Sequence, residues 1–372
     1  MTYPDTREIS RAAHRLTAVL DRATRARRGL PEPQVLLTAP GFEFAYGARA
    51  QRFEAASVGK VMTATLAFQL AEQGRLDLDA PVTGLLPRSD WDGLFVTEGV
   101  DHAAEVTLAK LLSHTSGVAD YFEGRARGTA PFIKSFVAEP DRLFTPSDLL
   151  DFSRQHQQPV AKPGTRFSYS DTGFVLAARA IEEAGGASLA GQLHARIFGP
   201  VGMDDSCLLF HSMPGGRASS ATPAEDLDLA PLWLGRTDDP RNELSRARSL
   251  SCDWGGGGVV STVDDLVRFS VAWHGGDLVS EASLRRMTHA THRFRPGIRY
   301  GTGAMQLRYG GFSPFLAGLP RLTGHLGVTG AHLFGDAGSG IHLAMNFHST
   351  REMYRSFRTH ISGVQTALRV SR

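Results

Sequence analysis

The feature that most constrains the fold is a run of small and apolar residues at positions 56–70 that contains one lysine, Lys60. The run continues for more than four helical turns without a polar face, and a helix that is apolar all round is buried. We therefore predict a buried helix that begins near Ser57. Lys60 needs an explanation, because a buried lysine is costly without a partner and the chain has only four lysines beside thirty-six arginines.

Ser57 and Lys60 are separated by three positions, which places both side chains on one face of a helix about one turn apart. Burial disfavours the lysine ammonium, so its amine could accept the serine proton. A serine at a helix N-terminus would also have its developing alkoxide stabilised by the helix dipole. The Ser-x-x-Lys spacing alone arises by chance in many chains, so its meaning depends on the rest of the sequence.

Two further segments carry candidate chemistry. Tyr169-Ser170-Asp171 follows a Pro-Gly turn and precedes a helix predicted from Thr172, so the phenol of Tyr169 could project into a cleft and move a proton. The alternative is a tyrosine packed over the helix start, with Asp171 as the N-cap. Residues 324–330, with glycine at 324, 327 and 330, read as a strand that a ligand backbone can approach closely; the alternative is a glycine-rich bulge. His325 taken alone is expected to be buried and hydrogen-bonded.

The order of predicted elements indicates an α/β (α+β) fold. Amphipathic or apolar periodicity predicts helices over residues 9–28, 108–114, 147–156, 172–184, 189–197, 263–274, 280–287 and 350–369. Strands are predicted over 34–38 and 42–46, joined by a turn at 39–41, and over 300–309, 322–326, 331–334 and 341–347. We expect an antiparallel sheet assembled from both chain ends (residues 1–75 and 250–372), flanked by the N- and C-terminal helices, with a mostly helical inserted domain at 76–249.

Composition excludes several classes of function. Forty basic against thirty-eight acidic side chains give a net charge of +2, which argues against nucleic acid or an anionic membrane as the main partner. The first eight residues lack the basic and apolar regions of a secretion signal, and no apolar run approaches the ~20 residues that span a bilayer, so we expect a cytoplasmic protein. Cys207 and Cys252 are too few for a zinc site and are expected to be buried thiols. Histidine spacing suggests no metal site, and no nucleotide loop is present, so no cofactor is expected.

In this order and with these flanks, the three segments resemble the serine β-lactamase-related family, which includes class C β-lactamases, D-alanyl-D-alanine carboxypeptidases, D-aminopeptidases, esterases and amidases. The similarity extends from about residue 46 to residue 348, with supporting stretches at 111–117, 163–170, 197–203 and 257–266. The resemblance implies that Ser57 is the nucleophile, that Lys60 is its partner in proton transfer, and that Tyr169 is base and acid with its pKa lowered by Lys60. It also implies that the strand with His325 and Gly327 holds the substrate, and that the backbone N–H groups of Ser57 and Val328 form the oxyanion hole.

Two positions depart from the usual family pattern. Asp171 stands where asparagine is common; a carboxylate near Lys60 would favour the ammonium and shift proton transfer toward Tyr169, and it could also accept a substrate N–H. His325 stands where many β-lactamases have lysine, and a histidine that is mostly neutral at pH 7 attracts a substrate carboxylate less strongly. Tyr121 is a candidate pocket wall, with core packing as an equally good interpretation, and Trp254 with the four glycines at 255–258 is a candidate wall on the substrate side. His114 is expected to bind loop backbone.

These observations predict a serine-dependent acyl hydrolase, an esterase or amidase, that acts on a small-molecule acyl substrate through an acyl-Ser57 intermediate. The alternative is an acyltransferase in a biosynthetic pathway, in which an amine or alcohol acceptor takes the acyl group. Both use one intermediate, so the sequence leaves them open. A β-lactamase or D,D-peptidase ranks lower because of the two departures, and a non-catalytic binding protein ranks lower because Ser57, Lys60 and Tyr169 are all retained.

Overall fold

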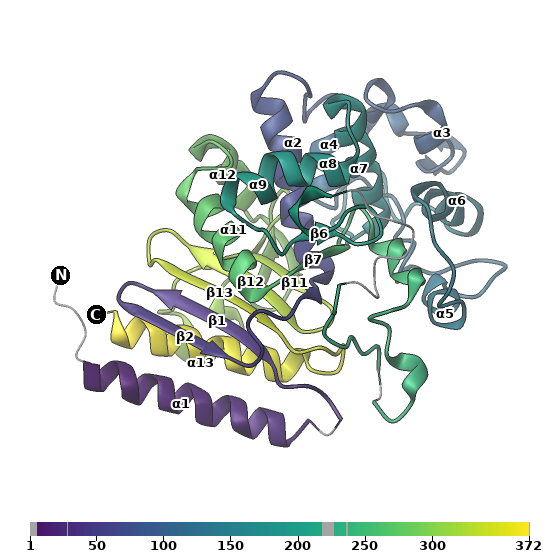
Figure 1. The fold of residues 1–372 in the computed structure, drawn as a ribbon. Helices are drawn as coiled ribbons and strands as arrows, with labels where there is room; N and C mark the ends of the chain where they lie inside the picture. Colours follow the sequence, from purple (N-terminus) through teal and green to yellow (C-terminus); the bar gives the residue numbers. More distant parts are fainter. Residues whose placement is uncertain (1–5, 28, 218–226, 236, 372) are drawn as a thin grey trace.

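The computed structural model of the chain describes residues 6–27, 29–217, 227–235 and 237–371. Its central feature is an eight-stranded antiparallel sheet with the strand order β2-β1-β13-β12-β11-β10-β9-β8 (Figure 1). The strands are β1 (Gln34–Ala39), β2 (Phe42–Tyr46), β8 (His292–Arg295), β9 (Ile298–Tyr300), β10 (Met305–Leu307), β11 (Thr323–Gly327), β12 (Ala331–Asp336) and β13 (Ile341–Asn346). β1 pairs with β13 from Gln34↔Asn346 to Thr38↔His342, which confirms that both chain ends build one sheet.

The predicted strand over 300–309 was wrong in its continuity. The chain instead forms β9 and β10, which pair with each other, and then a 3-10 turn at Tyr309–Gly311. The reversal lies between them, where the Gly301 N–H donates to the Ala304 carbonyl at 2.8 Å. Gly303 there has a φ of 87°, a backbone conformation that glycine adopts without strain.

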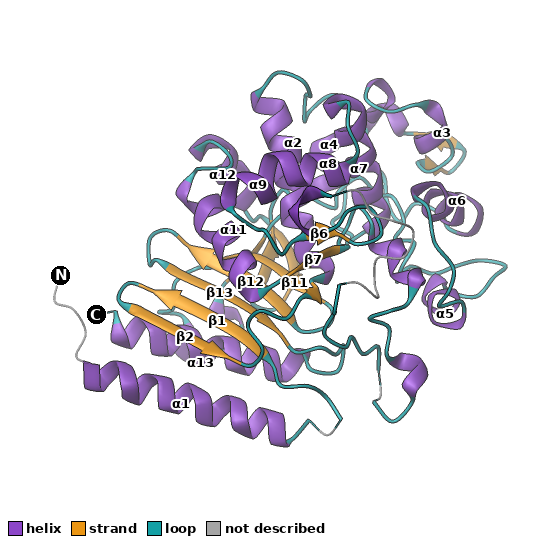
Figure 2. Cartoon of the chain, viewed as in Figure 1, coloured by secondary structure: helices purple, strands orange, loops and turns teal. Residues whose placement is uncertain are grey.

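The two terminal helices cover one face of the sheet, as expected. α1 (Thr6–Arg25) and α13 (Met353–Val370) lie side by side beneath it (Figures 1 and 2). α1 buries Ala12, Leu16 and Leu20, which recur at four-residue spacing on one helical face. The predicted helix over 9–28 therefore begins earlier and ends at Arg25. Its last predicted position, 28, lies outside the described residues, as do the first five of the eight residues compared with a secretion signal.

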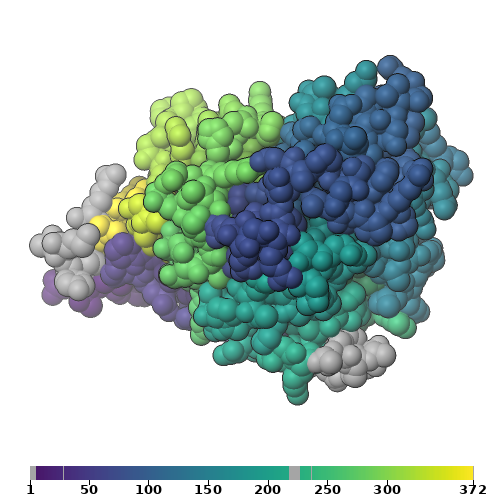
Figure 3. Space-filling view, turned by 90° about the horizontal axis from the view of Figure 1, so that it is seen from above, coloured from purple at the N-terminus to yellow at the C-terminus, as the bar shows by residue number. Residues whose placement is uncertain are grey.

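The other face of the sheet is covered by α11 (Val263–Gly275) and the helical part of the chain. This part contains α2 (Gly59–Glu72), α3 (Arg88–Trp91), α4 (Leu108–Leu112), α5 (Phe132–Ala138), α6 (Pro146–His156), α7 (Asp171–Gly185), α8 (Leu189–Leu193) and α9 (Gly199–Val201). α12 (Glu281–Thr288) follows α11, and the space-filling view shows the green residues of α11 and α12 against the blue and teal helical segment (Figure 3). Short 3-10 turns lie at Ala56–Val58, Val82–Gly84, Ala103–Glu105, Pro214–Gly216, Pro240–Asn242, Arg248–Asp253 and Pro314–Leu316, and a short π-helix at His194–Phe198. The remaining strands are β3 (Phe53–Glu54), β4 (Val96–Thr97), β5 (Val100–Asp101), β6 (Cys207–Leu208) and β7 (Val259–Ser261).

α2 occupies the centre of the molecule and packs against α7, α8 and β11. Eleven of its fourteen residues are buried, Lys60 among them, which confirms the buried helix predicted from the apolar run. Its position between the sheet and the helical part brings Ser57 to the junction of the two. The domain boundaries at residues 75 and 250 remain a prediction.

Several sequence expectations about whole classes of site can be compared with the described residues. Cys207 and Cys252 are buried free thiols, as predicted, and burial raises the pKa of Cys207 to about 12. No group of three or more potential metal ligands of the His, Cys, Asp or Glu type occurs within the described ranges. In the same ranges, no helix has the length and apolar character that crossing a membrane requires.

Candidate active site

Ser57 lies on a sharp 3-10 turn, Ala56–Val58, immediately before α2, so the helix begins at Gly59 and not at Ser57 itself. Ala56 has a φ of 49°, which is uncommon for a residue other than glycine. A side-chain oxygen of the buried Glu54 accepts the Ala56 N–H at 2.7 Å and helps to hold this turn. The turn leaves the Ser57 residue partly exposed, while Lys60, one turn further along, is completely buried.

Three acceptors surround the amine of Lys60. Its Nζ lies 2.9 Å from Ser57 Oγ, 2.5 Å from the carbonyl oxygen of Gly256 and 2.5 Å from Oδ1 of Asp171. Burial by itself lowers the pKa of Lys60, but the carboxylate of Asp171, helped by Asp253, outweighs it and raises the pKa above its usual value. Three acceptors match the three N–H donors of an ammonium group, so Lys60 is held in its charged form in this structure. The ion pair anticipated from the unusual Asp171 is therefore present.

Tyr169 stands directly before α7, whose N-cap is Ser170: the Ser170 hydroxyl accepts the Gly173 N–H at 3.2 Å. The alternative in which Asp171 caps the helix was wrong, because Asp171 is the first helical residue and directs its carboxylate to Lys60. The Tyr169 ring centroid lies 5.2 Å from Lys60 Nζ.

The charge state of Tyr169 differs from what the family resemblance implied. Burial, and then the negative charge of Asp171, raise the pKa of the phenol well above its usual value, while a hydrogen bond with the Ser57 side chain opposes the shift. The resemblance implied a pKa lowered by Lys60. The direction is reversed because burial, the largest cause, disfavours the charged phenolate, and the negative charge of Asp171 acts in the same direction. Tyr169 is therefore a neutral phenol at physiological pH in this structure.

His114 fixes the segment that presents Tyr169. Its Nδ1 accepts the Ser170 N–H at 3.1 Å, and its backbone carbonyl accepts the Ser168 N–H at 2.8 Å, which confirms the expected backbone-binding role. Its ring lies against the Tyr169 ring, with 4.2 Å between centroids. Burial lowers the pKa of His114 well below its usual value, so the ring is neutral and, with Nδ1 accepting, carries its proton on Nε2.

His325, on β11, points into the core. Its Nε2 bonds the Tyr300 hydroxyl at 3.0 Å, and its Nδ1 bonds the Leu326 carbonyl at 2.8 Å. Burial, with the charge of Lys60, lowers the pKa of His325 to about 3, so the ring is neutral, as the sequence suggested. The buried, hydrogen-bonded alternative describes this side chain. As placed, it has no exposed surface for a substrate, so its predicted substrate-binding role would require the ring to move.

The end of β11 lies beside the Ser57 turn. A Cβ on Gly327 would come within 2.7 Å of the Ala55 carbonyl oxygen and 3.0 Å of Ala56 Cβ, so this close approach requires glycine. Val328 follows and is 43% exposed. The structure thus brings Ser57, Lys60, Tyr169, Asp171 and the Gly327-Val328 segment together, while the roles of these residues remain predictions.

Tyr121 and Trp254, the candidate pocket walls, are core residues in this structure. Tyr121 is 2% exposed and donates its hydroxyl to the Cys252 carbonyl at 2.5 Å, and Trp254 is 4% exposed. Both belong to the large hydrophobic cluster beneath the helical part. Core packing, the alternative considered for Tyr121, is what the structure shows for both.

Sequence reasoning missed the part that Gly256 plays. A Cβ on Gly256 would lie 2.8 Å from Lys60 Nζ and 3.0 Å from Asp171 Oδ1, so the absence of a side chain lets the ion pair form against its backbone. The run of four glycines at 255–258 was the available signal, but it was interpreted as part of a substrate wall. Sequence reasoning also missed Asp253, a partly buried carboxyl whose pKa is raised to about 6 by desolvation against the opposing charge of Lys60.

Comparison with known proteins gives a consistent result. A family model described as "Beta-lactamase" matches residues 47–361. Penicillin-binding protein 4 of Amycolatopsis lactamdurans is 31% identical over 248 residues, which cover 63% of this chain and 56% of the relative. Monacolin J acid methylbutanoyltransferase of Aspergillus terreus is 29% identical over 217 residues, covering 55% of this chain and 48% of the relative.

Among solved structures, D-amino acid amidase from Ochrobactrum anthropi SV3, complexed with L-phenylalanine amide, superposes with a TM-score of 0.75 at 26% identity. The match covers 98% of this chain and 99% of that one. By contrast, the chain spans about half the length of the first curated relatives it matches. The comparison therefore supports the whole fold. The activities named for the longer relatives are statements about those proteins, and the partial match does not assign them to this chain.

Proposed function

This chain belongs to the Beta-lactamase family, and from that premise we propose that it is a serine-dependent acyl hydrolase that opens a small-molecule ester or amide through an acyl-Ser57 intermediate. The observation that carries the proposal is the 2.9 Å contact between Ser57 Oγ and the fully buried Lys60 Nζ, with Ser57 itself partly exposed. A nucleophile that reaches solvent, backed by a buried cation, can attack a substrate while the charge of its transition state is stabilised.

Proton transfer in the proposed reaction runs through Tyr169. Since both Lys60 and Tyr169 are protonated at rest, neither is a ready base. In the proposed step, Ser57 Oγ forms a bond to the carbonyl carbon, its proton passes to the Tyr169 oxygen, and the phenol proton passes to the leaving atom as its bond to carbon breaks. The products are an acyl-Ser57 ester and a neutral alcohol or amine, and Tyr169 ends as it began. Water resolves the ester by the same relay in reverse.

Lys60 has an electrostatic role in this proposal. Held as an ammonium by Asp171 and the Gly256 carbonyl, it stabilises the negative charge that develops on Ser57 Oγ during attack. The backbone N–H groups of Ser57 and Val328 are proposed to bind the carbonyl oxygen of the substrate, because the glycine at 327 allows β11 to approach the Ser57 turn. Direct recognition of a substrate N–H by Asp171 competes with its ion pair to Lys60.

The direct test is labelling with a fluorophosphonate probe followed by intact-mass measurement. We expect one adduct on the wild-type chain and none on Ser57→Ala. Ser168→Ala is the matched control, because it removes another partly exposed serine next to Tyr169 and should keep the adduct. Absence of an adduct on the wild type, or an equal adduct on Ser57→Ala, would overturn the acyl-enzyme proposal.

A second candidate function is acyl transfer, favoured by the similarity to an acyltransferase. An amine or alcohol would then replace water in resolving acyl-Ser57. The two are distinguished by product partition when an activated ester is offered with a panel of amines. Amide that grows at the expense of free acid and saturates with amine supports transfer, and acid that is unaffected by amine supports hydrolysis.

The cellular location remains the cytoplasm in our proposal. Fractionation of cells that produce the protein, with immunodetection in each fraction, tests it.

A further inference from the structure

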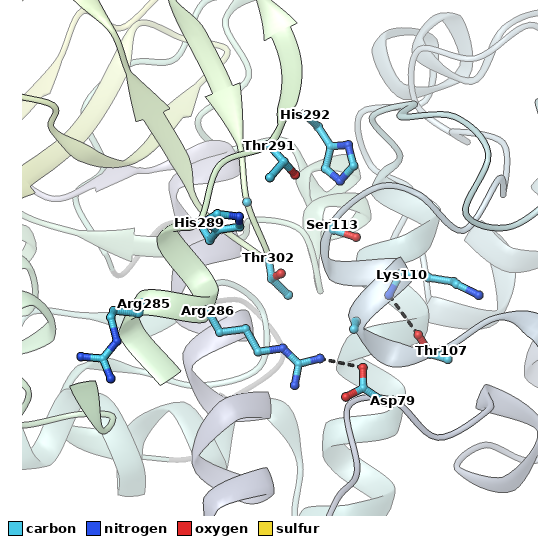
Figure 4. Close-up of a pocket in the computed structure, with 12 residues that line it drawn as sticks. Asp79, Thr107, Lys110, Ser113, Arg285, Arg286, His289, Thr291, His292 and Thr302 are labelled. Atoms are coloured by element: carbon cyan, nitrogen blue, oxygen red, sulfur yellow. Dashed lines mark hydrogen bonds and ion pairs between the residues drawn. The ribbon is translucent and has the colours of Figure 1, made fainter. Parts of the chain in front are cut away.

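A cavity of about 600 Å³ lies between α4, α12 and the start of β8 (Figure 4). Ser57 is not among the residues that line it. Its charged lining consists of three cations, Lys110, Arg285 and Arg286, and one carboxylate, Asp79. His289 and His292 add two imidazole groups. The lining therefore has an excess of two positive charges before either histidine is protonated.

The sequence around the cavity is also unbalanced in charge. Residues 282–335 contain seven arginines and neither aspartate nor glutamate, although basic and acidic residues nearly cancel in the whole chain, at 40 against 38. This segment supplies α12 apart from its first residue, then β8 to β11 and most of β12. Positive potential is thus concentrated at the end of the molecule where the cavity lies, which would attract an anion.

The cationic groups keep donors for a ligand after their internal contacts are counted. Arg286 pairs with Asp79 at 2.6 Å through one of its five N–H groups, and Arg285 pairs with Glu281, which is not part of the lining. Lys110 donates one of three N–H groups to the Glu105 carbonyl at 2.5 Å. Thr107 Oγ1 accepts the Lys110 backbone N–H at 3.3 Å, so its own hydroxyl hydrogen can be donated elsewhere. Figure 4 shows the guanidinium of Arg286, on α12, directed toward Asp79, and Lys110, on α4, beyond Asp79 with its amine turned away from Arg286.

From this arrangement we propose that the cavity binds a small organic oxyanion, namely a phosphate ester or a carboxylate. Guanidinium, ammonium and hydroxyl groups, all of which the lining contains, are the donors that recognise such oxygens. The volume falls in the range of roughly 300–1,000 Å³ that is typical of sites for whole small molecules, which favours an organic anion over a bare inorganic ion. The proposal rests on this cavity alone and does not require the proposed acyl chemistry.

The cavity adjoins the residues that position Tyr169. The His292 ring stacks on Phe167, with 5.6 Å between centroids and 15° between planes, and Phe167 precedes Tyr169 by two residues. Ser113, which also lines the cavity, directly precedes His114, whose ring packs on Tyr169. An anion held in the cavity therefore contacts the same segments that hold the candidate catalytic tyrosine.

The proposal is tested by calorimetric titration of the Ser57→Ala chain at low ionic strength with phenyl phosphate, benzoate and benzamide. Ser57→Ala prevents turnover, so the result is independent of whether the chain is an acyl hydrolase. We expect binding of phenyl phosphate or benzoate and none of benzamide, which has the shape of benzoate without its charge. The anion that binds more tightly shows whether the cavity prefers a phosphate ester or a carboxylate. Binding of neither anion, or equal binding of benzamide, would overturn the proposal.

Variants locate the site. Lys110→Gln is expected to weaken anion binding by about 3-fold or more, and Lys110→Gln combined with Arg286→Gln by about 10-fold or more, since each removes a positive charge from the lining. Asp79→Asn should strengthen it by roughly 3-fold, because it removes the one carboxylate of the lining and frees Arg286. Arg295→Gln, also on β8 but outside the lining, is the control with the same change in net charge. An equal loss of anion binding in Arg295→Gln would show that the effect comes from the general positive potential of the molecule. That result would contradict a specific site in the cavity.

Discussion

Gly256→Ala tests the inference that a bare backbone is needed beside the Lys60–Asp171 pair. An added Cβ would stand 2.8 Å from Lys60 Nζ, whereas ordinary contacts begin near 3.4 Å. Either the Cβ or Nζ must therefore move away by the difference, 0.6 Å. If Nζ makes the whole movement away from Ser57, its 2.9 Å contact with Ser57 Oγ lengthens to about 3.5 Å, beyond the range of a good hydrogen bond. The φ of Gly256 lies outside the left-handed region, so alanine itself is tolerated by the backbone.

The expected loss of rate follows from this displacement. A misplacement of ~1 Å in a catalytic group costs about 100-fold, so a shift of this size should slow acylation of Ser57 by roughly 10- to 100-fold. Overpacking a tight site costs about 1–3 kcal/mol of stability, which leaves a folded variant. The assay is the rate of fluorophosphonate adduct formation, followed by mass, with thermal unfolding recorded in parallel.

The matched control is Gly84→Ala, because a Cβ at Gly84 meets nothing within 4 Å and its φ is also outside the left-handed region. It should acylate at the wild-type rate. A folded Gly256→Ala chain that also acylates at the wild-type rate would refute the reasoning, since Lys60 would then tolerate the side chain without leaving Ser57.

Three further predictions concern proton transfer and acid stability. Tyr169→Phe should lower the acylation rate about 100-fold while its ring still packs on His114, and a rate near that of the wild type would contradict the proposed relay. Asp171→Asn removes the charge that raises the pKa of Lys60, so burial prevails and the ammonium is lost at lower pH; the fall in acylation rate at alkaline pH should move to lower pH, and an unchanged pH profile would refute this. His360, on α13, is buried against His332 of β12, and burial lowers its pKa to about 3, so the unfolded chain binds a proton that the folded chain does not between about pH 6.5 and 3. Stability should be full above about pH 6.5 and fall as the pH decreases, by up to about 1.4 kcal/mol per pH unit from this group; urea unfolding of the wild type against His360→Gln measures it, and an identical pH dependence in the two would contradict it.

Local sequence patterns predicted some features of the candidate site and not others. The three-residue spacing of Ser57 and Lys60, and the turn before α7 that presents Tyr169, were predictable because a helix fixes neighbours within one turn. Whether His325 serves a substrate or the core was not predictable, because β11 is buried along its whole length and only the hydrogen bond to Tyr300 places the ring. Tyr121 and Trp254 lie on turns, which have no periodic buried face, so the sequence could not assign them to a pocket or to the core.

Sequence by itself determined that the chain buries a lysine next to a serine, that both ends contribute strands to one sheet, and that a tyrosine stands before a central helix. Tertiary structure alone decided the charge on that lysine. Its partners are Asp171 and the Gly256 carbonyl, the latter 196 positions away, and neither the apolar period of α2 nor the Ser-x-x-Lys spacing refers to them. Burial and ion pairing act in opposite directions on the pKa of Lys60, and only the packing of α7 and the glycine run against α2 sets the balance between them.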